Sequence, residues 1–219
     1  MNVAAHMLDN SQLLLALQRV LYNSYAAAAA AIPTIAGVDL EQQQQIAHLL
    51  PTTRVPAAVL VPIIQRSAQL TVLLTERASH LKHHGGQISF PGGRIETADA
   101  SPMQAALRET EEEIGLSREF AEVIGYLPQH LIFTGYCVTP VVALVNPDFS
   151  LQIDACEVAS VFEVPLHFIL NPANHQARER QIGDMKVRVY DLPYGERHIW
   201  GATAGILMNL YRLLNEDNQ

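Results

Sequence analysis

The sequence predicts an α/β fold in which a mixed β-sheet lies between layers of helices, with a helical extension at the N-terminus. Strand-like runs dominate the middle of the chain, helical patterns stand at both ends, and one well-capped helix is inserted between strands. Helices and strands arranged in this way are typical of a sheet covered by helices. We expect residues 1–50 to form the extension and residues 51–219 to form the main domain.

The composition favours a folded chain and disfavours a general nucleic-acid binder. Of its 219 residues, 49% are hydrophobic and 16% are charged, so a sizeable core can form. The formal net charge of -8 makes the chain a poor general binder of nucleic acid, which requires clustered Lys and Arg. A small anionic substrate is compatible with this charge where bound cations mask it.

We expect a cytoplasmic protein that does not bind membranes. The first residues lack the basic stretch and apolar run of a secretory signal, and no run reaches the roughly 18 apolar residues of a membrane span. Cys137 and Cys156 lie outside any C-x-x-C pattern, which indicates neither a zinc site nor a disulfide framework. Reduced thiols are favoured, and a single bridge between the two stays open.

The elements before the central helix follow from hydrophobic spacing. Residues 9–31 are predicted to be one helix, because Leu13, Leu17 and Leu21 recur at helical spacing until Pro33. The glutamine run at 42–45 reads as an exposed helical turn. Two β-rich runs at 57–65 and 71–77, separated by a polar turn, predict a hairpin. A short strand is expected at 88–90.

The remaining elements alternate in type. A helix is predicted over 101–115, where Ser101 is a good N-cap, Pro102 suits the first helical position and Gln104 could complete a capping box. Gly115 suits the C-terminal stop. Strands are expected at 123–131, 136–145, 158–164 and 186–192, with a helical turn after the third and a closing helix at 199–214. In that last helix, Gly201 and Gly205 have GxxxG spacing, for which close packing is favoured over dimerisation, and a homodimer stays open.

Three glutamates share one face of the central helix. Glu109, Glu112 and Glu113 stand at i, i+3 and i+4, where like charges repel. They also crowd the C-terminal half, where the helix dipole disfavours anions, and only Arg108 is close enough in sequence to offset them. A hard divalent cation would explain this placement, since Mg²⁺ binds carboxylates and substrate phosphates. From the helix alone, a solvated acidic face is the favoured alternative.

A glycine pair upstream shifts the balance towards a metal site. Gly92 and Gly93 let the backbone adopt unusual dihedral angles and approach a ligand closely. The Gly93 carbonyl could then join the glutamates as a metal ligand, and Gly92 is expected to face the substrate. A glycine pair, a short spacer and a carboxylate-rich helix together are far more specific than any one of them.

At these residues the chain resembles the Nudix hydrolases. Their pattern is G-x5-E-x7-R-E-U-x-E-E-x-G-U, where U is a bulky apolar residue; Gly93 matches its start, and residues 108–116, RETEEEIGL, match its second half. Thr110 replaces an apolar residue. One extra residue precedes Arg108, so the first glutamate of the pattern falls at Ala100, beside Asp99. The resemblance therefore gives that position no role.

A second resemblance points to the coenzyme A pyrophosphatases of that family. Residues 73–93 follow the motif L-L-T-x-R-S/A-x3-R-x3-G-x3-F-P-G-G, with Arg77 in place and Lys82 where Arg is usual. Lysine keeps the charge and loses the bidentate fork. The two motifs together cover residues 73–116.

The resemblance implies metal-dependent hydrolysis with Mg²⁺ or Mn²⁺ as cofactor. Glu112 and Glu113 are expected to hold the metal, and Glu109 is either a third ligand or an acceptor for the proton of the nucleophile. Arg108 should brace these carboxylates by ion pairing. Two further metal ligands are expected, the Gly93 carbonyl and a distant carboxylate, for which Glu157 is the candidate and Glu163 the alternative.

The substrate implied by the resemblance is a small nucleotide derivative. Arg77, Lys82, His83 and His84 are the candidate cationic or donor groups for its phosphates, although the histidines could equally be exposed loop residues. Tyr136 and Trp200 are expected to serve packing. Coenzyme A or its thioesters are favoured as substrates, ADP-ribose or a dinucleotide is the alternative, and a catalytically idle binding module is disfavoured by the intact glutamates.

Overall fold

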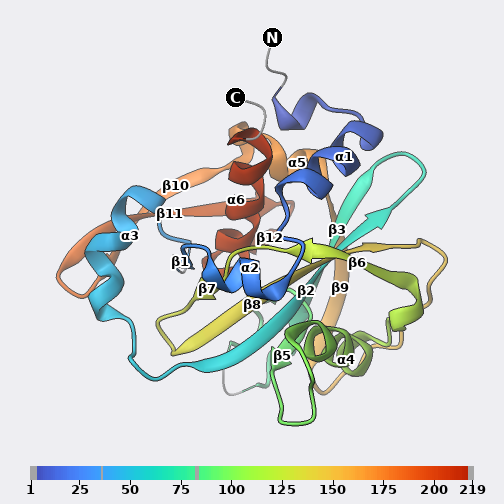
Figure 1. Ribbon diagram of the computed structural model, residues 1–219, viewed down its shortest axis with the longest axis horizontal. Helices are drawn as coiled ribbons and strands as arrows, with labels where there is room; N and C mark the ends of the chain where they lie inside the picture. The colour runs from blue at the N-terminus through green and yellow to red at the C-terminus, as the bar shows by residue number, and fades with distance from the viewer. Residues whose placement is uncertain (1–3, 36, 82–83, 217–219) are drawn as a thin grey trace.

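The computed structural model describes residues 4–35, 37–81 and 84–216 and has the expected α/β architecture (Figure 1). The main mixed sheet contains β1 (Thr34–Ile35), β2 (Val55–Gln65), β3 (Leu70–Arg77), β4 (Ile88–Ser89), β5 (Gly92–Arg94), β6 (Ala121–Tyr126), β7 (His130–Leu131), β8 (Tyr136–Val145) and β9 (Val158–Pro165). A smaller antiparallel sheet contains β10 (Gln176–Ile182), β11 (Met185–Tyr194) and β12 (Arg197–Ile199). The helices are α1 (Asn10–Val20), α2 (Tyr25–Ala30), α3 (Leu40–Ile46), α4 (Pro102–Ile114), α5 (Leu166–Leu170) and α6 (Gly201–Glu216), with short 3-10 turns at Ala5–Met7, Ala47–Leu49, Arg118–Phe120 and Pro172–Asn174.

Strand β2 is the centre of the main sheet. It pairs in parallel with β8 along ten residues, from Val55 opposite Tyr136 to Ile64 opposite Val145. On its other side it pairs antiparallel with β3, which confirms the predicted hairpin, and with β5. Parallel and antiparallel pairs in one sheet make it mixed, as predicted, and the long apolar run of β2 suits a strand covered on both faces.

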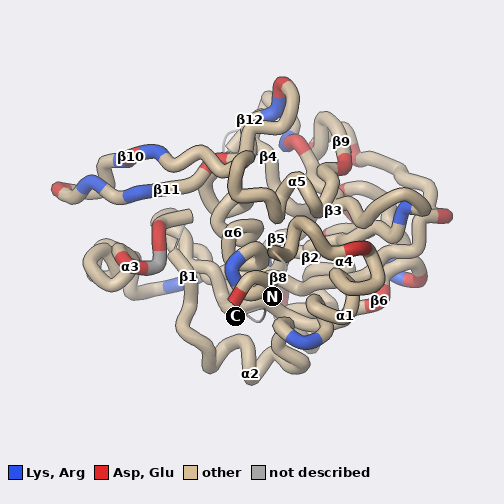
Figure 2. The backbone as a smooth tube through the Cα atoms, turned by 90° about the horizontal axis from the view of Figure 1, so that it is seen from above, with Lys and Arg blue, Asp and Glu red and all other residues tan. Residues whose placement is uncertain are grey.

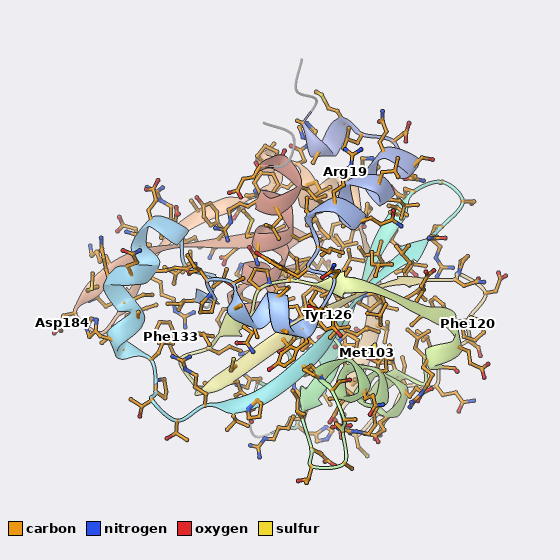
Figure 3. The ribbon with its side chains drawn as sticks, viewed as in Figure 1. Arg19, Met103, Phe120, Tyr126, Phe133 and Asp184 are labelled. Carbon is orange, nitrogen blue, oxygen red and sulfur yellow. The ribbon has the colours of Figure 1, made fainter. Side chains whose placement is uncertain are left out.

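Alternate residues of β2 enter two different cores. Ala58 and Leu60 pack in a cluster with Ala105 and Ala106 of α4. Their neighbours, including Val61, face the opposite cluster, which holds residues of α1, α5 and α6. The side-chain period of two in a strand produces this division. The sheet therefore lies between helical layers, and Figure 3 shows Met103 of α4 and Tyr126 of β6, both of which belong to the first cluster.

The N-terminal segment contributes to this packing. Leu13 and Leu17 of α1 are fully buried in the same cluster as Leu207 and Leu210 of α6. Strand β1 adds to the main sheet by pairing in parallel with β7. The division of the chain into residues 1–50 and 51–219 stays a prediction.

The single helix expected over residues 9–31 is wrong, because the chain forms two helices there. Asp9 caps α1 through a capping box with Gln12, and α1 ends at Val20. Tyr22 then leaves the helical path and exchanges two backbone hydrogen bonds with Tyr126, at 3.0 and 2.9 Å. The hydroxyl of Ser24 accepts from the Ala27 N–H and starts α2. A pairing across the fold thus outweighs the local helical pattern.

The strand expected over residues 123–131 is also divided. Strands β6 and β7 both pair with β8, but residues 127–129 between them do not belong to either strand. Strands β1, β5, β10 and β12 are additional to the prediction. Figure 2 shows the β10–β11 hairpin projecting from the body of the molecule with charged residues along it, and Figure 3 places Asp184 at its tip. The residues of β10 are almost all exposed and polar, so they lack the apolar alternation that identifies a strand.

The structure also describes the two cysteines and the GxxxG pair. Cys137 and Cys156 are free thiols, the first half-buried and the second exposed. Among the described residues, no helix combines the length and the apolar character needed to cross a bilayer. The GxxxG pair serves packing within the chain: a Cβ atom on Gly205 would lie 2.5 Å from the backbone nitrogen of Gly37, and one on Gly37 would lie 2.8 Å from the Gly201 carbonyl oxygen.

The variant Gly205→Ala tests this close approach. Its methyl group would also lie 2.6 Å from Cε1 of the buried His130, so the surroundings would have to move. We expect a loss of about 1–3 kcal/mol in the free energy of unfolding, measured by urea denaturation. At a free helical position the same change would stabilise by about 0.5–1 kcal/mol. A higher denaturation midpoint for Gly205→Ala would therefore contradict this packing.

Candidate active site

Helix α4 presents the acidic face, and both of its predicted ends are confirmed. The Ser101 hydroxyl accepts from the Gln104 N–H at 3.3 Å, and Gly115 closes the helix in the left-handed region at φ 68°. The Gln104 side chain bonds to the Ala100 N–H instead of completing a capping box. Thr110 is buried and satisfies its hydroxyl on the Ala106 carbonyl one turn earlier, so the polar replacement in the motif is accommodated.

Arg108 holds the carboxylates together. Its guanidinium lies 3.0 Å from Glu109 and 2.9 Å from Glu112, and one of its nitrogens donates to the Arg94 carbonyl at 3.3 Å. The pKa of Arg108 is raised, mainly by its hydrogen bonds to Asp99, so it stays charged throughout the accessible pH range. Glu111 points elsewhere and binds Arg118. The predicted bracing role therefore has a direct geometrical basis.

Asp99 occupies the position that the extra residue before Arg108 left open. Its two oxygens accept from Nε and Nη2 of Arg108 at 3.1 and 2.9 Å, a bidentate pair, and its side chain is only 5% exposed. The same carboxylate accepts from the Glu96 N–H at 2.8 Å and so fixes the loop before the helix. Hydrogen bonds from Arg108 lower the pKa of Asp99. An aspartate next to Ala100 thus ties the loop to the helix.

The glycine pair lies in close contact with Glu113 and Glu109. The Gly92 N–H donates to Glu113 at 3.1 Å, and a Cβ atom on Gly93 would lie 2.5 Å from the carboxylate carbon of Glu109. Gly92 has φ 145° and faces the backbone of Ala58 across the β5–β2 pair, where a side chain has no room. Glycine is required at both positions because backbone and carboxylates approach so closely.

Glu113 is the most buried carboxylate of the site. Its side chain is 5% exposed, and burial raises its pKa to about 7, in spite of the Gly92 hydrogen bond and the charge of Arg77 at 3.8 Å. Burial also raises the pKa of Glu109, and the charge of Glu157 acts on both groups in the same direction. The fold therefore brings Glu157, although distant in sequence, into the field of the helical glutamates.

The negative charge of these carboxylates suits a divalent cation, although their oxygens are not arranged around one common point. Among the described residues, no three Asp, Glu, His or Cys side chains converge on one point, because Glu109 and Glu112 turn towards Arg108. The Glu112 side chain is 60% exposed and free to reorient. A cation beside Glu113 would offset the burial that raises its pKa. Carboxylate oxygens are the donors that Mg²⁺ and Mn²⁺ accept.

A cavity of about 650 Å³ adjoins this cluster and gathers most of the candidate substrate residues. Arg77, His84, Gly92 and Gly93 line it. His84 adopts φ 61° and its ring nitrogen lies 2.9 Å from the Gln87 side chain. Lys82 and His83 lie outside the described residues. Glu163 is bound to Arg66 and Thr71, away from the cluster.

The cavity also contains residues that sequence reasoning missed or treated as packing. Two further arginines line it, Arg94 and Arg180, together with three aromatic residues, Phe133, Tyr136 and Trp200. The guanidinium of Arg180 lies 5.4 Å from the Trp200 ring centre, and Arg94 donates to the Tyr136 hydroxyl at 2.8 Å. No local pattern identifies these residues, because they come from separate elements, β5, β8, β10 and the turn before α6, that only the fold brings together.

The comparisons with known proteins agree with this geometry. The sequence profile of the NUDIX domain matches residues 53–184, which is more than half of the chain and includes the whole of α4. The chain belongs to the Nudix hydrolase family. It is thus a diphosphatase, a hydrolase of diphosphate bonds, and the predicted class of enzyme is confirmed.

Two curated members of the Nudix family show the extent of the similarity. The chain is 43% identical over 154 residues to a protein described as uncharacterized Nudix hydrolase NudL from Enterobacter sp. (strain 638) and to its counterpart from Escherichia coli (strain K12). Each match covers 70% of this chain and 80% of the relative. Neither description names a substrate.

Solved Nudix structures are more distant. A C. elegans Ap4A hydrolase in a binary complex is 22% identical over 51% of this chain and 80% of that chain, with a TM-score of 0.43. The NUDIX domain of Shewanella oneidensis NrtR complexed with ADP ribose is 22% identical over 58% of this chain and 86% of that chain, with a TM-score of 0.42.

The variant Asp99→Asn tests the tie between loop and helix. Asparagine keeps one acceptor but removes the charge and half of the fork, and a hydrogen bond to a charged group contributes about 1.5–3 kcal/mol. We expect the diphosphatase kcat/KM to fall roughly tenfold or more. Asp148→Asn, an exposed aspartate away from the cluster, is the matched control. Equal activity of both variants would show that Asp99 does not position Arg108.

The raised pKa of Glu113 predicts a pH dependence of stability in the metal-free protein. Folding holds a proton on Glu113 between its ordinary pKa of 4.5 and about 7, so the folded state binds more protons than the unfolded state there. The free energy of unfolding should therefore fall as pH rises through this window, by at most about 3 kcal/mol, and level off above it.

Denaturation in the presence of a chelator measures this effect as the difference between the wild type and Glu113→Gln, which cannot titrate. Glu119→Gln, exposed and outside the cluster, is the control and should follow the wild type. A constant difference between the wild type and Glu113→Gln across the window would contradict a raised pKa.

Proposed function

We propose that this Nudix hydrolase splits the diphosphate bond of coenzyme A or its thioesters. The products would be 4'-phosphopantetheine, or its acyl form, and adenosine 3',5'-bisphosphate. The observation that carries the proposal is the position of the second motif. It runs along β3, through the loop with His84, to β5, and its Arg77 and its glycine pair form one wall of the large cavity beside Glu113.

In the proposed reaction, water attacks one phosphorus of the diphosphate, the bond from that phosphorus to the bridging oxygen breaks, and the bridging oxygen leaves with the other phosphate. A divalent cation, when bound, neutralises the diphosphate charge and makes water a better nucleophile. Glu112 and Glu113 would hold this cation, with Glu157 and the Gly93 carbonyl as further ligands. Glu109 is the third carboxylate, and its raised pKa suits an acceptor for the proton that the attacking water loses.

The positive groups of the cavity suit the remaining charges of this substrate. Coenzyme A carries a 3'-phosphate in addition to its diphosphate, and Arg94 and Arg180 are exposed cations that line the cavity. The Trp200 ring supplies an apolar face on which a nucleobase can stack. A cavity of this volume lies within the usual range for sites that enclose a small organic ligand.

A second function is a Nudix pyrophosphatase for ADP-ribose or another nucleoside diphosphate derivative. The carboxylate cluster and the stacking surface would serve such a substrate equally well. It lacks the 3'-phosphate, however, so Arg94 and Arg180 would have less charge to bind.

A substrate panel distinguishes the two functions. The protein is incubated with Mg²⁺ or Mn²⁺ and with coenzyme A, its 3'-dephospho form, ADP-ribose, NADH or a diadenosine polyphosphate, and the products are identified by mass. We expect the highest kcat/KM for coenzyme A. Faster turnover of ADP-ribose than of coenzyme A would overturn the proposal in favour of the alternative, and no turnover of any substrate would support an idle binding module.

The variant Glu112→Gln tests the role of the exposed carboxylate in the same assay. If Glu112 holds the metal, we expect kcat to fall roughly 10²-fold or more, as after the loss of other groups that stabilise transition-state charge. Glu119→Gln serves again as the control. Activity of Glu112→Gln near that of the wild type would remove this residue from the mechanism.

A further inference from the structure

A second, smaller cavity lies beside α6, and the glutamates of the carboxylate cluster do not line it. It has a volume of about 270 Å³ and is enclosed by α6, β11 and the segment around β1. Helix α6 contacts both of these strands, and Figure 1 shows α6 running across β11. None of the residues that line this cavity also lines the larger one.

The wall of this cavity contains a cation, Arg212, that forms no direct ion pair with any described residue. Arg212 is half-buried, and burial lowers its pKa. Its guanidinium makes only two long hydrogen bonds, at 3.4 Å each, to the Met208 carbonyl and the Asn209 side chain. Within the part of the chain that the structure describes, no carboxylate oxygen lies within 4.0 Å of it. Glu216 and Asp39 act on this guanidinium only from a longer range, so a half-buried cation in this position still favours an anion in direct contact.

His130 adds an unused hydrogen-bonding group to the same wall. The residue is only 1% exposed; its Nδ1 lies 2.7 Å from the Thr34 hydroxyl, while its Nε2 has no partner. Burial and the charge of Arg212 lower the pKa of His130 to about 3, so the ring is neutral at physiological pH. When the Thr34 hydroxyl donates to Nδ1, Nε2 carries the hydrogen and is a donor without an acceptor. Buried polar groups are rarely left in this state.

The acidic residue of the cavity, Asp39, already has a hydrogen-bond donor and an ion-pair partner. Asp39 receives a hydrogen bond from the Tyr190 hydroxyl at 3.3 Å and lies 3.6 Å from the guanidinium of Arg188. The Gln43 amide is likewise occupied, since it donates to the Val38 carbonyl at 2.8 Å. Asp39 offsets part of the Arg212 charge from a longer range, but its direct ion pair among the described residues is with Arg188.

We propose that this cavity is a binding site for a small phosphate-bearing anion, held by Arg212 with His130 as a second donor. The volume equals that of about nine water molecules, which leaves room for a phosphate group with a small organic substituent. The planar guanidinium matches the geometry of phosphate oxygens. The proposal is independent of the substrate hydrolysed at the carboxylate cluster.

Titration of the full-length, metal-free protein with inorganic phosphate tests this site. The ring signals of His130 and His175, which both line the cavity, are followed by NMR, and the affinity is measured by calorimetry. We expect saturable shifts of the His130 signals. Arg212→Gln should weaken binding about tenfold or more, because a charge-assisted hydrogen bond is lost. Arg77→Gln, in the larger cavity, should leave this binding unchanged.

Two further measurements separate a loss of phosphate binding from a loss of folding. Arg212→Lys retains the charge without the fork and should bind phosphate with intermediate affinity, and thermal melting checks that each variant is folded. Unmoved His130 signals in the wild type would overturn the proposal and leave a water-filled cavity only. Phosphate binding that survives Arg212→Gln but is lost in Arg77→Gln would assign the anion to the larger cavity and overturn it equally.

Discussion

The candidate active site depends on the charge of one side chain, Arg108. Helix α4 carries its carboxylates near its C-terminal end, where they repel one another and oppose the helix dipole. Arg108 offsets this through Glu109 and Glu112 on the helix, and through the bidentate pair with Asp99 it joins the helix to the loop before it. The loop begins directly after β5, so the same contacts help to hold Gly92 and Gly93 against the glutamates.

Arg108 does not pair with Glu113, so the carboxylates of the acidic face differ in how well their charge is compensated. Glu112 is exposed and paired, whereas Glu113 is buried with only the Gly92 N–H and the more distant Arg77 as partners. The difference explains why burial dominates the pKa of Glu113. An added divalent cation would act most strongly on this group, because its charge is the least solvated and the least compensated.

The parts of this site that could be predicted from the sequence are the local ones. The ends of α4 follow from Ser101 and Gly115, and the glutamate face follows from helical spacing, so both could be assigned before the fold was known. Asp99 illustrates the limit. Its partner is nine residues away, and the family pattern places a glutamate one position later, so only the folded loop shows that Asp99 fills that place.

Contacts between distant elements could not be predicted in this way. Trp200 and Arg180 face the large cavity because β10 and the turn before α6 lie together in the fold, and the exposed residues of β10 show no alternation that would reveal a strand. The break in the first predicted helix has the same origin. Its local spacing favours a continuous helix, but the pairing of Tyr22 with Tyr126 is made across the fold.

Helix α6 is the element that the two cavities share. Its first turn, from Gly201 to Thr203, lines the larger cavity, and Gly205, Met208 and Arg212 line the smaller one. Gly205 touches the backbone at Gly37 so closely that α6 cannot shift without moving the segment beside β1. Packed interfaces of this kind transmit displacement because they have little free volume. A ligand in either cavity would therefore contact the same helix, and thermodynamic linkage requires that any effect of one ligand on the affinity of the other be reciprocal.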